Sequence, residues 1–198
     1  PPQEIVSLGL SPYVLTKLGI YQLLGPVEGS FSHAQTNSHV GTVAPYSVAR
    51  SPFGIFFLGN DFQVYVFNGS QSRPVSQKED GIDIAPFFQG VNVNGNGNLY
   101  TAYAHNCFGV WFENRYWLSY PDGTSTVANK MIVYDAIHDR WATDTRTFPV
   151  LSVEPSGILV GGGNDGFLYQ LENGNSDNGS NISMTAEMKE ITLSPENV

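Results

Sequence analysis

The chain has 198 residues, of which 13% are aromatic and only 14% charged, with 21 glycines and 12 prolines. So many turn residues and so few charges favour an all-β domain and exclude a coiled coil or a disordered chain. The net charge of −9 argues against proteins that wrap nucleic acid or lie on anionic membranes, because both need a basic surface.

Cysteine and apolar runs set further bounds on the chain. Cys107 is the only cysteine, so no disulfide can form within the chain, and we expect it to be a small buried residue. No apolar run approaches the roughly 20 residues that cross a bilayer. The sequence opens on Pro1 rather than Met and closes without a natural finish, so we expect a fragment of a longer chain.

The first predicted elements are two short strands at residues 13–16 and 20–23, joined as a hairpin. Residues 26–39 lack periodicity and predict a long loop. Residues 41–49 predict a strand interrupted at Pro45, because proline cannot donate a hydrogen bond to a β ladder.

Three clearer hairpins follow, at residues 54–67, 108–120 and 157–171. Each has a nearly all-apolar first strand led by a glycine, which we expect in an inner position, buried on both faces. Residues 131–141 predict another strand, a polar turn and a return carrying Trp141. We expect this bulky side chain to fill the wedge between adjacent sheets.

Three other segments have weaker signals. Ser76 and Glu79 are spaced as a capping box and predict a short helix over residues 74–82. Residues 173–181 form a low-complexity stretch that predicts a loop, and residues 182–188 alternate like an edge strand.

A short phrase recurs at residues 19–25, 63–69 and 167–174, each time an aliphatic–Tyr–x–apolar strand running into a glycine turn. Repeated strand–turn units are typical of β-propeller blades. We therefore predict an all-β fold: a β-propeller or partial propeller built of antiparallel hairpin or four-stranded blades of about 45–55 residues. It would form a single domain over residues 1–198, with blade-like units at about 11–50, 51–107, 108–156 and 157–188.

The sequence carries no nucleophile elbow, no zinc-protease motif and no phosphate-cradling loop with its lysine. We predict no catalytic, cofactor-binding or metal-binding residue, and expect the four histidines to be solvated loop residues. A calcium loop over residues 173–179 is the alternative to a flexible turn, but Asn178 and Met184 stand where such a loop needs Gly and Glu.

Acidic pairs offer a further alternative. Asp135 with Asp139, and Asp144 with Glu154, have the residue type of glycosidase acids, although turn chemistry is the favoured interpretation.

Aromatic side chains are the remaining candidates, as a surface that binds protein or stacks on sugar. Strand alternation buries about half of them in any case, so a structural use is favoured. The candidates are Phe87, Phe88, Trp111, Tyr116, Trp117 and Tyr120.

Several phrases resemble one known family. Residues 41–49 followed by 54–61 are similar to a Gly-x-Val-Ala-Pro-x-Ser segment and a Gly-Ile-Phe-Phe-Leu-Gly-x-Asp hairpin of phage proteins. Residues 68–76 and 165–182 are similar as well, while the chain departs at Phe62, where the family pattern has Gly. The family is the β-propeller virion proteins of tailed phages, which includes the packaged-DNA stabilisation (tail adaptor) proteins of short-tailed phages.

This resemblance implies a non-enzymatic virion structural protein of the tail or head–tail connector, a scaffold around the path of the DNA. It also implies other virion proteins as partners, a homo-oligomeric ring, no sequence-specific nucleic-acid binding and no membrane span. A carbohydrate-binding propeller for host attachment is the first alternative, and a glycoside-cleaving propeller the second.

Overall fold

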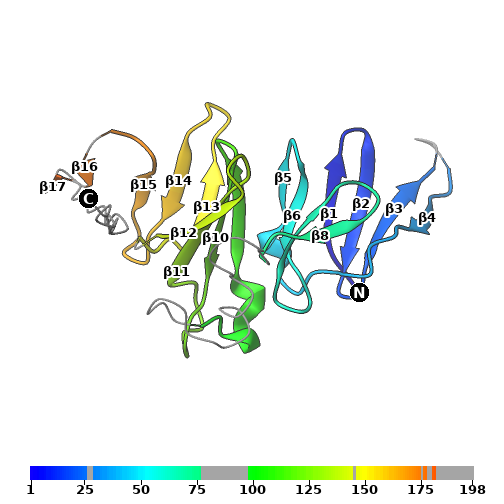
Figure 1. Ribbon diagram of the computed structural model, residues 1–198, viewed down its shortest axis with the longest axis horizontal. Helices are drawn as coiled ribbons and strands as arrows, with labels where there is room; N and C mark the ends of the chain where they lie inside the picture. Colours follow the sequence, from blue (N-terminus) through cyan, green and yellow to red (C-terminus); the bar gives the residue numbers. More distant parts are fainter. Residues whose placement is uncertain (26–28, 77–97, 145, 175, 178–179, 182–198) are drawn as a thin grey trace, which may run out of the picture.

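The computed structural model describes residues 1–25, 29–76, 98–144, 146–174, 176–177 and 180–181 (Figure 1). The fold is all-β and antiparallel, as predicted, with two short 3-10 helices, η1 (Pro45–Ser47) and η2 (Thr101–Asn106). No helix in this described part is long and apolar enough to span a membrane. The predicted edge strand at residues 182–188 lies outside the described residues, as does the predicted helix from residue 77 onward.

Four antiparallel sheets follow one another along the chain, each with its strands hydrogen-bonded in chain order. The first sheet comprises β1 (Pro2–Leu8), β2 (Ser11–Thr16), β3 (Ile20–Leu24) and β4 (Ser32–Gln35). The second comprises β5 (Ala49–Ser51), β6 (Gly54–Leu58), β7 (Val64–Phe67) and β8 (Ser72–Pro74). The third comprises β9 (Phe108–Phe112), β10 (Arg115–Tyr120), β11 (Lys130–Asp135) and β12 (Arg140–Asp144). The fourth comprises β13 (Val150–Val153), β14 (Leu159–Gly162) and β15 (Leu168–Gln170), and a small hairpin of β16 (Ser176–Asp177) and β17 (Ser180–Asn181) follows it.

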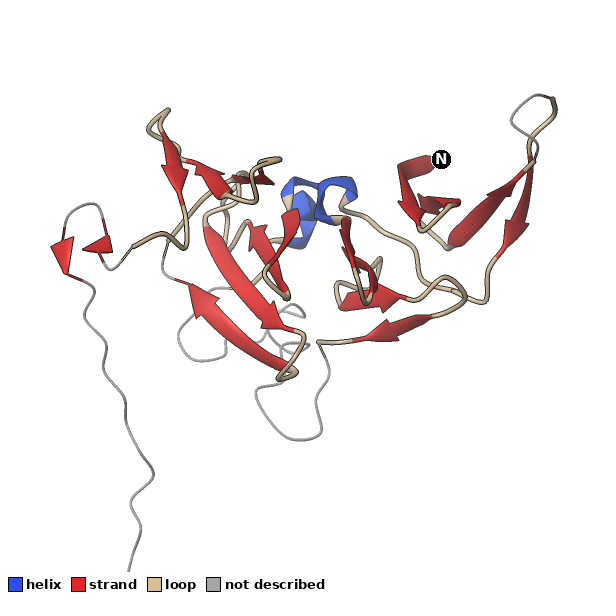
Figure 2. Ribbon diagram, turned by 90° about the horizontal axis from the view of Figure 1, so that it is seen from above, coloured by secondary structure: helices blue, strands red, loops and turns tan. Residues whose placement is uncertain are grey.

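The sheets stack face to face in chain order along the long axis of the molecule (Figures 1 and 2). A separate hydrophobic cluster fills each of the three spaces between neighbouring sheets. Because strand residues alternate between faces, Ile55 and Phe57 of β6 pack toward the first sheet while Phe56 and Leu58 pack toward the third. The two middle sheets are therefore buried on both faces.

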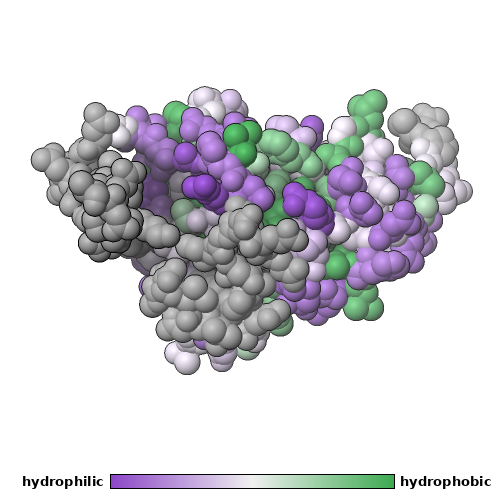
Figure 3. All heavy atoms as spheres, viewed as in Figure 1, coloured by the Kyte–Doolittle hydropathy of each residue, from purple (hydrophilic) through white to green (hydrophobic). Residues whose placement is uncertain are grey.

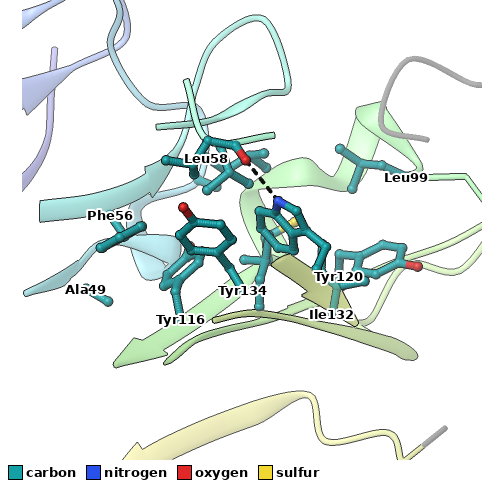
Figure 4. Close-up of a cluster of buried hydrophobic side chains, with 14 of the residues drawn as sticks. Ala49, Phe56, Leu58, Leu99, Tyr116, Tyr120, Ile132 and Tyr134 are labelled. Carbon is teal, nitrogen blue, oxygen red and sulfur yellow. Dashed lines mark hydrogen bonds between the residues drawn. The ribbon is translucent and has the colours of Figure 1, made fainter. Parts of the chain in front are cut away.

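The cluster between the second and third sheets is rich in aromatic rings (Figure 4). The Phe56 ring stacks on the Tyr116 ring with centroids 5.3 Å apart. Trp141 is buried in this cluster and its indole N–H donates to the Val75 carbonyl at 2.9 Å, which confirms the predicted wedge between sheets. Cys107 is also buried here, as expected.

The first strands of the four sheets form a common side of the stack. β1 contacts β5, β5 contacts β9, and β9 contacts β13. The sheets are thus joined in sequence along these strands, and their later strands extend away from this side.

All the predicted hairpins that fall on described residues are present, but residues 41–49 do not form the predicted strand. Pro45 begins η1 instead, and the strand β5 begins only at Ala49. Polar side chains explain the difference: Thr42 Oγ1 donates to the Leu58 carbonyl at 2.8 Å, and Ser47 Oγ donates to the Ala44 carbonyl at 2.7 Å. These bonds favour a local turn over a ladder.

The predicted loop at residues 26–39 was also wrong in part, because β4 lies within it. All four residues of β4 are exposed, so this edge strand has none of the apolar alternation that would identify it. The strand β1 was not predicted either, since half-buried and exposed residues alternate along it without a regular apolar pattern.

Gly109, the glycine that leads the hairpin at residues 108–120, occupies a different place from the glycines of the other two hairpins. Gly54 opens β6 and Gly157 precedes β14, both second strands, whereas Gly109 lies inside the first strand β9. In the third sheet, the residue just before the second strand is Asn114, which has a positive φ, as Gly54 and Gly157 also have. β6 is buried along its length, as expected for these strands, whereas β9 is only half-buried.

The two-residue turn between β9 and β10 suggests a stabilising double substitution. Glu113 and Asn114 both have positive φ, 47° and 61°, a conformation that Asn and Gly adopt at lower cost than Glu. Replacing the pair with Asn-Gly (Glu113→Asn with Asn114→Gly) should raise the free energy of unfolding by about 1 kcal/mol. Urea denaturation would measure this, and an unchanged or lower midpoint would contradict the turn assignment.

Candidate functional site

The predicted aromatic surface lies mostly in the core. Tyr116 and Tyr120 are buried between the second and third sheets, and Trp117 is buried between the third and fourth. The side chains of Tyr116 and Tyr120 therefore present no face for a sugar or a partner protein. Trp111 is half-buried against the Phe56 ring, at 5.2 Å between centroids. Phe87 and Phe88 lie outside the described residues.

Burial changes the acid–base behaviour of the core tyrosines. The Tyr116 hydroxyl donates to the Ser47 carbonyl at 2.7 Å, and burial raises its pKa well above 10.0. Burial likewise raises the pKa of Tyr120 and Tyr134, and a hydrogen bond to Asp139 adds to the effect at Tyr134. The neutral phenols are therefore the form that the folded state favours.

These shifts predict unfolding in alkali. Because the folded pKa values exceed the ordinary 10.0, the stability they contribute is complete below that pH and is lost as the pH rises toward the folded values. The urea midpoint should fall steadily above about pH 10. Tyr116→Phe should make this fall less steep, whereas Tyr46→Phe, which removes an exposed hydroxyl, should not. A midpoint independent of pH in this range would contradict the burial described here.

A polar cleft of about 540 Å³ opens beside the third sheet, where it faces the segment that follows the fourth. Trp117 and Trp141 line it together with charged groups from β10, β11 and β12, among them Arg115, Asp135 and Arg140. The fourth sheet has three strands against the four of the third sheet, so its strands cover the third sheet incompletely.

Ion pairs tie the two sides of this cleft together. The Arg146 guanidinium donates to both Asp144 carboxylate oxygens and to Glu172 at 2.9 Å, and Arg115 lies 3.6 Å from the other Glu172 oxygen. The guanidinium carbon of Arg146 also lies 5.9 Å from the centroid of the Trp117 ring. These contacts raise the pKa of Arg146 further above its usual range and hold its charge between sheets.

The acidic residues considered as catalytic pairs are engaged in turns. Asp135 accepts hydrogen bonds from the backbone N–H of Ile137 and His138, and its other oxygen lies 2.9 Å from His138 Nδ1, so its pKa is lowered. Asp144 accepts the backbone N–H of Arg146 at 2.8 Å. Within the described ranges, no group of three or more His, Cys, Asp or Glu could hold a metal ion.

An apolar groove of about 690 Å³ lies on the face of the first sheet that points away from the stack. Val14, Tyr21 and Leu23 line it, and Lys17 and His33 are its charged or ionisable side chains. The His33 ring packs edge-on against the Tyr21 ring at 5.7 Å. Hydrophobic residues also reach the surface elsewhere at the first-sheet end of the molecule, at right in Figure 3.

Neither the cleft nor the groove was predicted from the sequence. Arg115, Arg146 and Glu172 are distant in the chain and meet only because the sheets stack, so no local pattern identifies them. The groove did leave a signal, because Tyr21 belongs to the recurring aliphatic–Tyr phrase.

Comparison with models of known protein families gave no match, and no curated protein matched the sequence.

Proposed function

We propose that this chain is a propeller-type, non-catalytic scaffold in the virion of a tailed phage, placed in the tail or the head–tail connector around the path of the DNA. The observation that carries the proposal is the stack itself. The structure uses sheet faces for packing against other sheets, and both middle sheets have both faces buried in this way. Such an architecture suits a protein whose work is to hold its neighbours in place.

The arrangement of the first strands supports the propeller part of the proposal. Blades of a propeller radiate from a central axis, with neighbouring blades in contact along their innermost strands. Here the first strand of each sheet contacts the first strand of the next. β1, β5, β9 and β13 correspond to the innermost strands in this proposal.

The hairpins that carry the family resemblance share one geometry. Asp61 accepts a hydrogen bond from the Tyr65 hydroxyl at 2.7 Å, and Asp165 accepts one from the Tyr169 hydroxyl in the same way. Phe62, where the chain departs from the family's Gly, has a φ of 64°, the left-handed conformation that glycine adopts freely. The chain therefore differs from the family pattern at this position in its side chain but keeps the backbone conformation that a glycine would adopt, which supports the resemblance.

The acidic net charge of the chain is compatible with a location next to the path of the DNA. A net charge of −9 repels phosphate, and a surface that repels phosphate lets DNA slide past without sticking. Base recognition would need basic groups aimed at the grooves, which is not the role proposed.

An immunoblot of size-fractionated lysate tests this function. We expect an antibody against the chain to detect it in the fractions that contain DNA-filled particles, and to lose that signal when particles are removed by centrifugation. Detection only in the fractions of free protein would contradict the virion role.

Carbohydrate binding is the second candidate function, and the polar cleft favours it. Arg115, Asp135, His138 and Arg140 place hydrogen-bonding groups around one opening, which is the chemistry that sugar hydroxyls need. A glycan array tests it: binding that Arg140→Ala abolishes would support an attachment role, and no binding to any glycan would dismiss it.

A further inference from the structure

The recurring aliphatic–Tyr pair occupies the same place in every sheet, the third strand. The four pairs are Ile20-Tyr21, Val64-Tyr65, Val133-Tyr134 and Leu168-Tyr169. Adjacent residues of a strand point to opposite faces, so each pair sends one side chain to each face of its sheet.

The direction is the same at all three junctions of the stack. The aliphatic residue faces the following sheet: Ile20, Val64 and Val133 lie in the first, second and third inter-sheet clusters. The tyrosine of the following sheet packs into the same cluster from the other side. These tyrosines are Tyr65, Tyr134 and Tyr169, in the same order.

Two members of the series point outward from the four-sheet stack. Tyr21, which should face a preceding sheet, lines the apolar groove on the outer face of the first sheet with Val14. Leu168, which should face a following sheet, is 82% exposed on the outer face of the fourth. Val150 stands opposite Gly162 beside it and is 51% exposed.

The two outer faces each carry a charged residue, and the two residues have opposite sign. Lys17 lies at the groove of the first sheet, four residues before Tyr21. At the same distance before the corresponding tyrosine, the second sheet has Asp61 and the fourth sheet has Asp165. On the fourth sheet, every second residue from Val150 onward points to the outer face, and Glu154 follows Ser152 in this alternation. Glu154 thus has the charge opposite to that of Lys17.

We propose that the outer face of the fourth sheet docks onto the outer face of the first sheet of a second copy of this chain, with Leu168 packed against Tyr21. The junction repeats the geometry of the three internal ones, so it continues an interface the molecule already uses. It joins two different surfaces, so copies associate head to tail, and such contacts close into a ring or extend as a filament. Head-to-tail stacking presupposes the scaffold role proposed above and names its partner.

Sedimentation velocity of the purified chain, with two single-face variants, tests the junction. Tyr21→Lys places a charge in the groove, and Leu168→Lys places one on the opposite face. The unaltered chain should form species larger than a dimer as its concentration rises. Each variant alone should need a concentration more than about tenfold higher to associate, because a lysine must be desolvated at the junction.

Mixing the two variants gives the decisive result. Each retains one intact face, so the mixture should form a one-to-one dimer and nothing larger. Leu10→Lys, in the exposed turn between β1 and β2, is the matched control and should associate like the unaltered chain. A monomer at every concentration, or a Leu168→Lys variant that dimerises alone at the same concentration as the unaltered chain, would overturn the head-to-tail junction. Neither result alters the particle immunoblot, so the failure of the two proposals can be told apart.

Discussion

Replacing Gly109 with alanine should lower the free energy of unfolding by about 2–4 kcal/mol. A Cβ at this position would overlap the Ser47 carbonyl oxygen and lie 2.6 Å from the Tyr116 hydroxyl. These two atoms are joined by the buried hydrogen bond that links η1, which precedes the second sheet, to β10 of the third. The substitution therefore both overpacks the junction and separates a buried donor from its acceptor.

Gly162→Ala is the matched control for this prediction. Gly162 is also a strand glycine, but the nearest atom to a Cβ there lies 3.9 Å away, an ordinary contact. Urea denaturation of both variants should show a change within about 0.5 kcal/mol for the control. Equal effects would mean that the second and third sheets do not approach each other at Gly109 as described.

Phe56→Ala should be the most destabilising core truncation, at about 3–5 kcal/mol. Phe56 is 1% exposed, and its ring contacts those of Trp111, Tyr116 and Tyr134 at centroid distances of 5.2, 5.3 and 5.9 Å. The substitution removes the one ring of the second sheet that these three rings of the third sheet share. A cavity remains, because sheets held by two cores cannot close freely around it.

Phe31→Ala removes the same side chain from the surface and serves as the control. Phe31 is 69% exposed, so its loss should change stability by no more than about 0.5 kcal/mol. Thermal unfolding followed by circular dichroism measures both variants. If Phe56→Ala lowered the stability only slightly, the second and third sheets would not pack against each other at Phe56 as described.

Repetition was the part of the fold that the sequence could predict. The phrases at residues 20–23, 64–67 and 168–171 all proved to be third strands, in which the aliphatic residue and the tyrosine point to opposite faces of the sheet. The hairpin at residues 54–67 was equally clear, since its apolar run and its Gly-Asn-Asp turn are both local signals.

The errors arose where a residue's role depends on its neighbours in space. β4 is an exposed edge, so burial imposes no pattern on it. The sequence around Pro45 predicts an interrupted strand. In the structure, the Thr42 and Ser47 hydroxyls donate hydrogen bonds to the Ala44 carbonyl and form a turn instead. Gly109 resembles Gly54 in sequence, yet it is needed for close approach within a first strand and not for a turn.

The candidate site was harder to predict than the fold. Tyr116, Trp117 and Tyr120 are aromatic for reasons of packing, and a sequence does not separate core aromatic residues from exposed ones when sheets are covered on both faces. The more informative residue was Leu168, which is 82% exposed where its three counterparts Ile20, Val64 and Val133 are buried. That contrast exists only once the stack is known.

Cryo-electron microscopy of the purified particle tests the central claim, a virion scaffold of stacked sheets, most directly. We expect density at the tail or head–tail interface into which the four-sheet stack fits as a unit, with further sheets against both of its outer faces and the DNA path beside it. Particles whose reconstructed tail and connector lack any such density, while the chain is found only as free protein, would contradict the account.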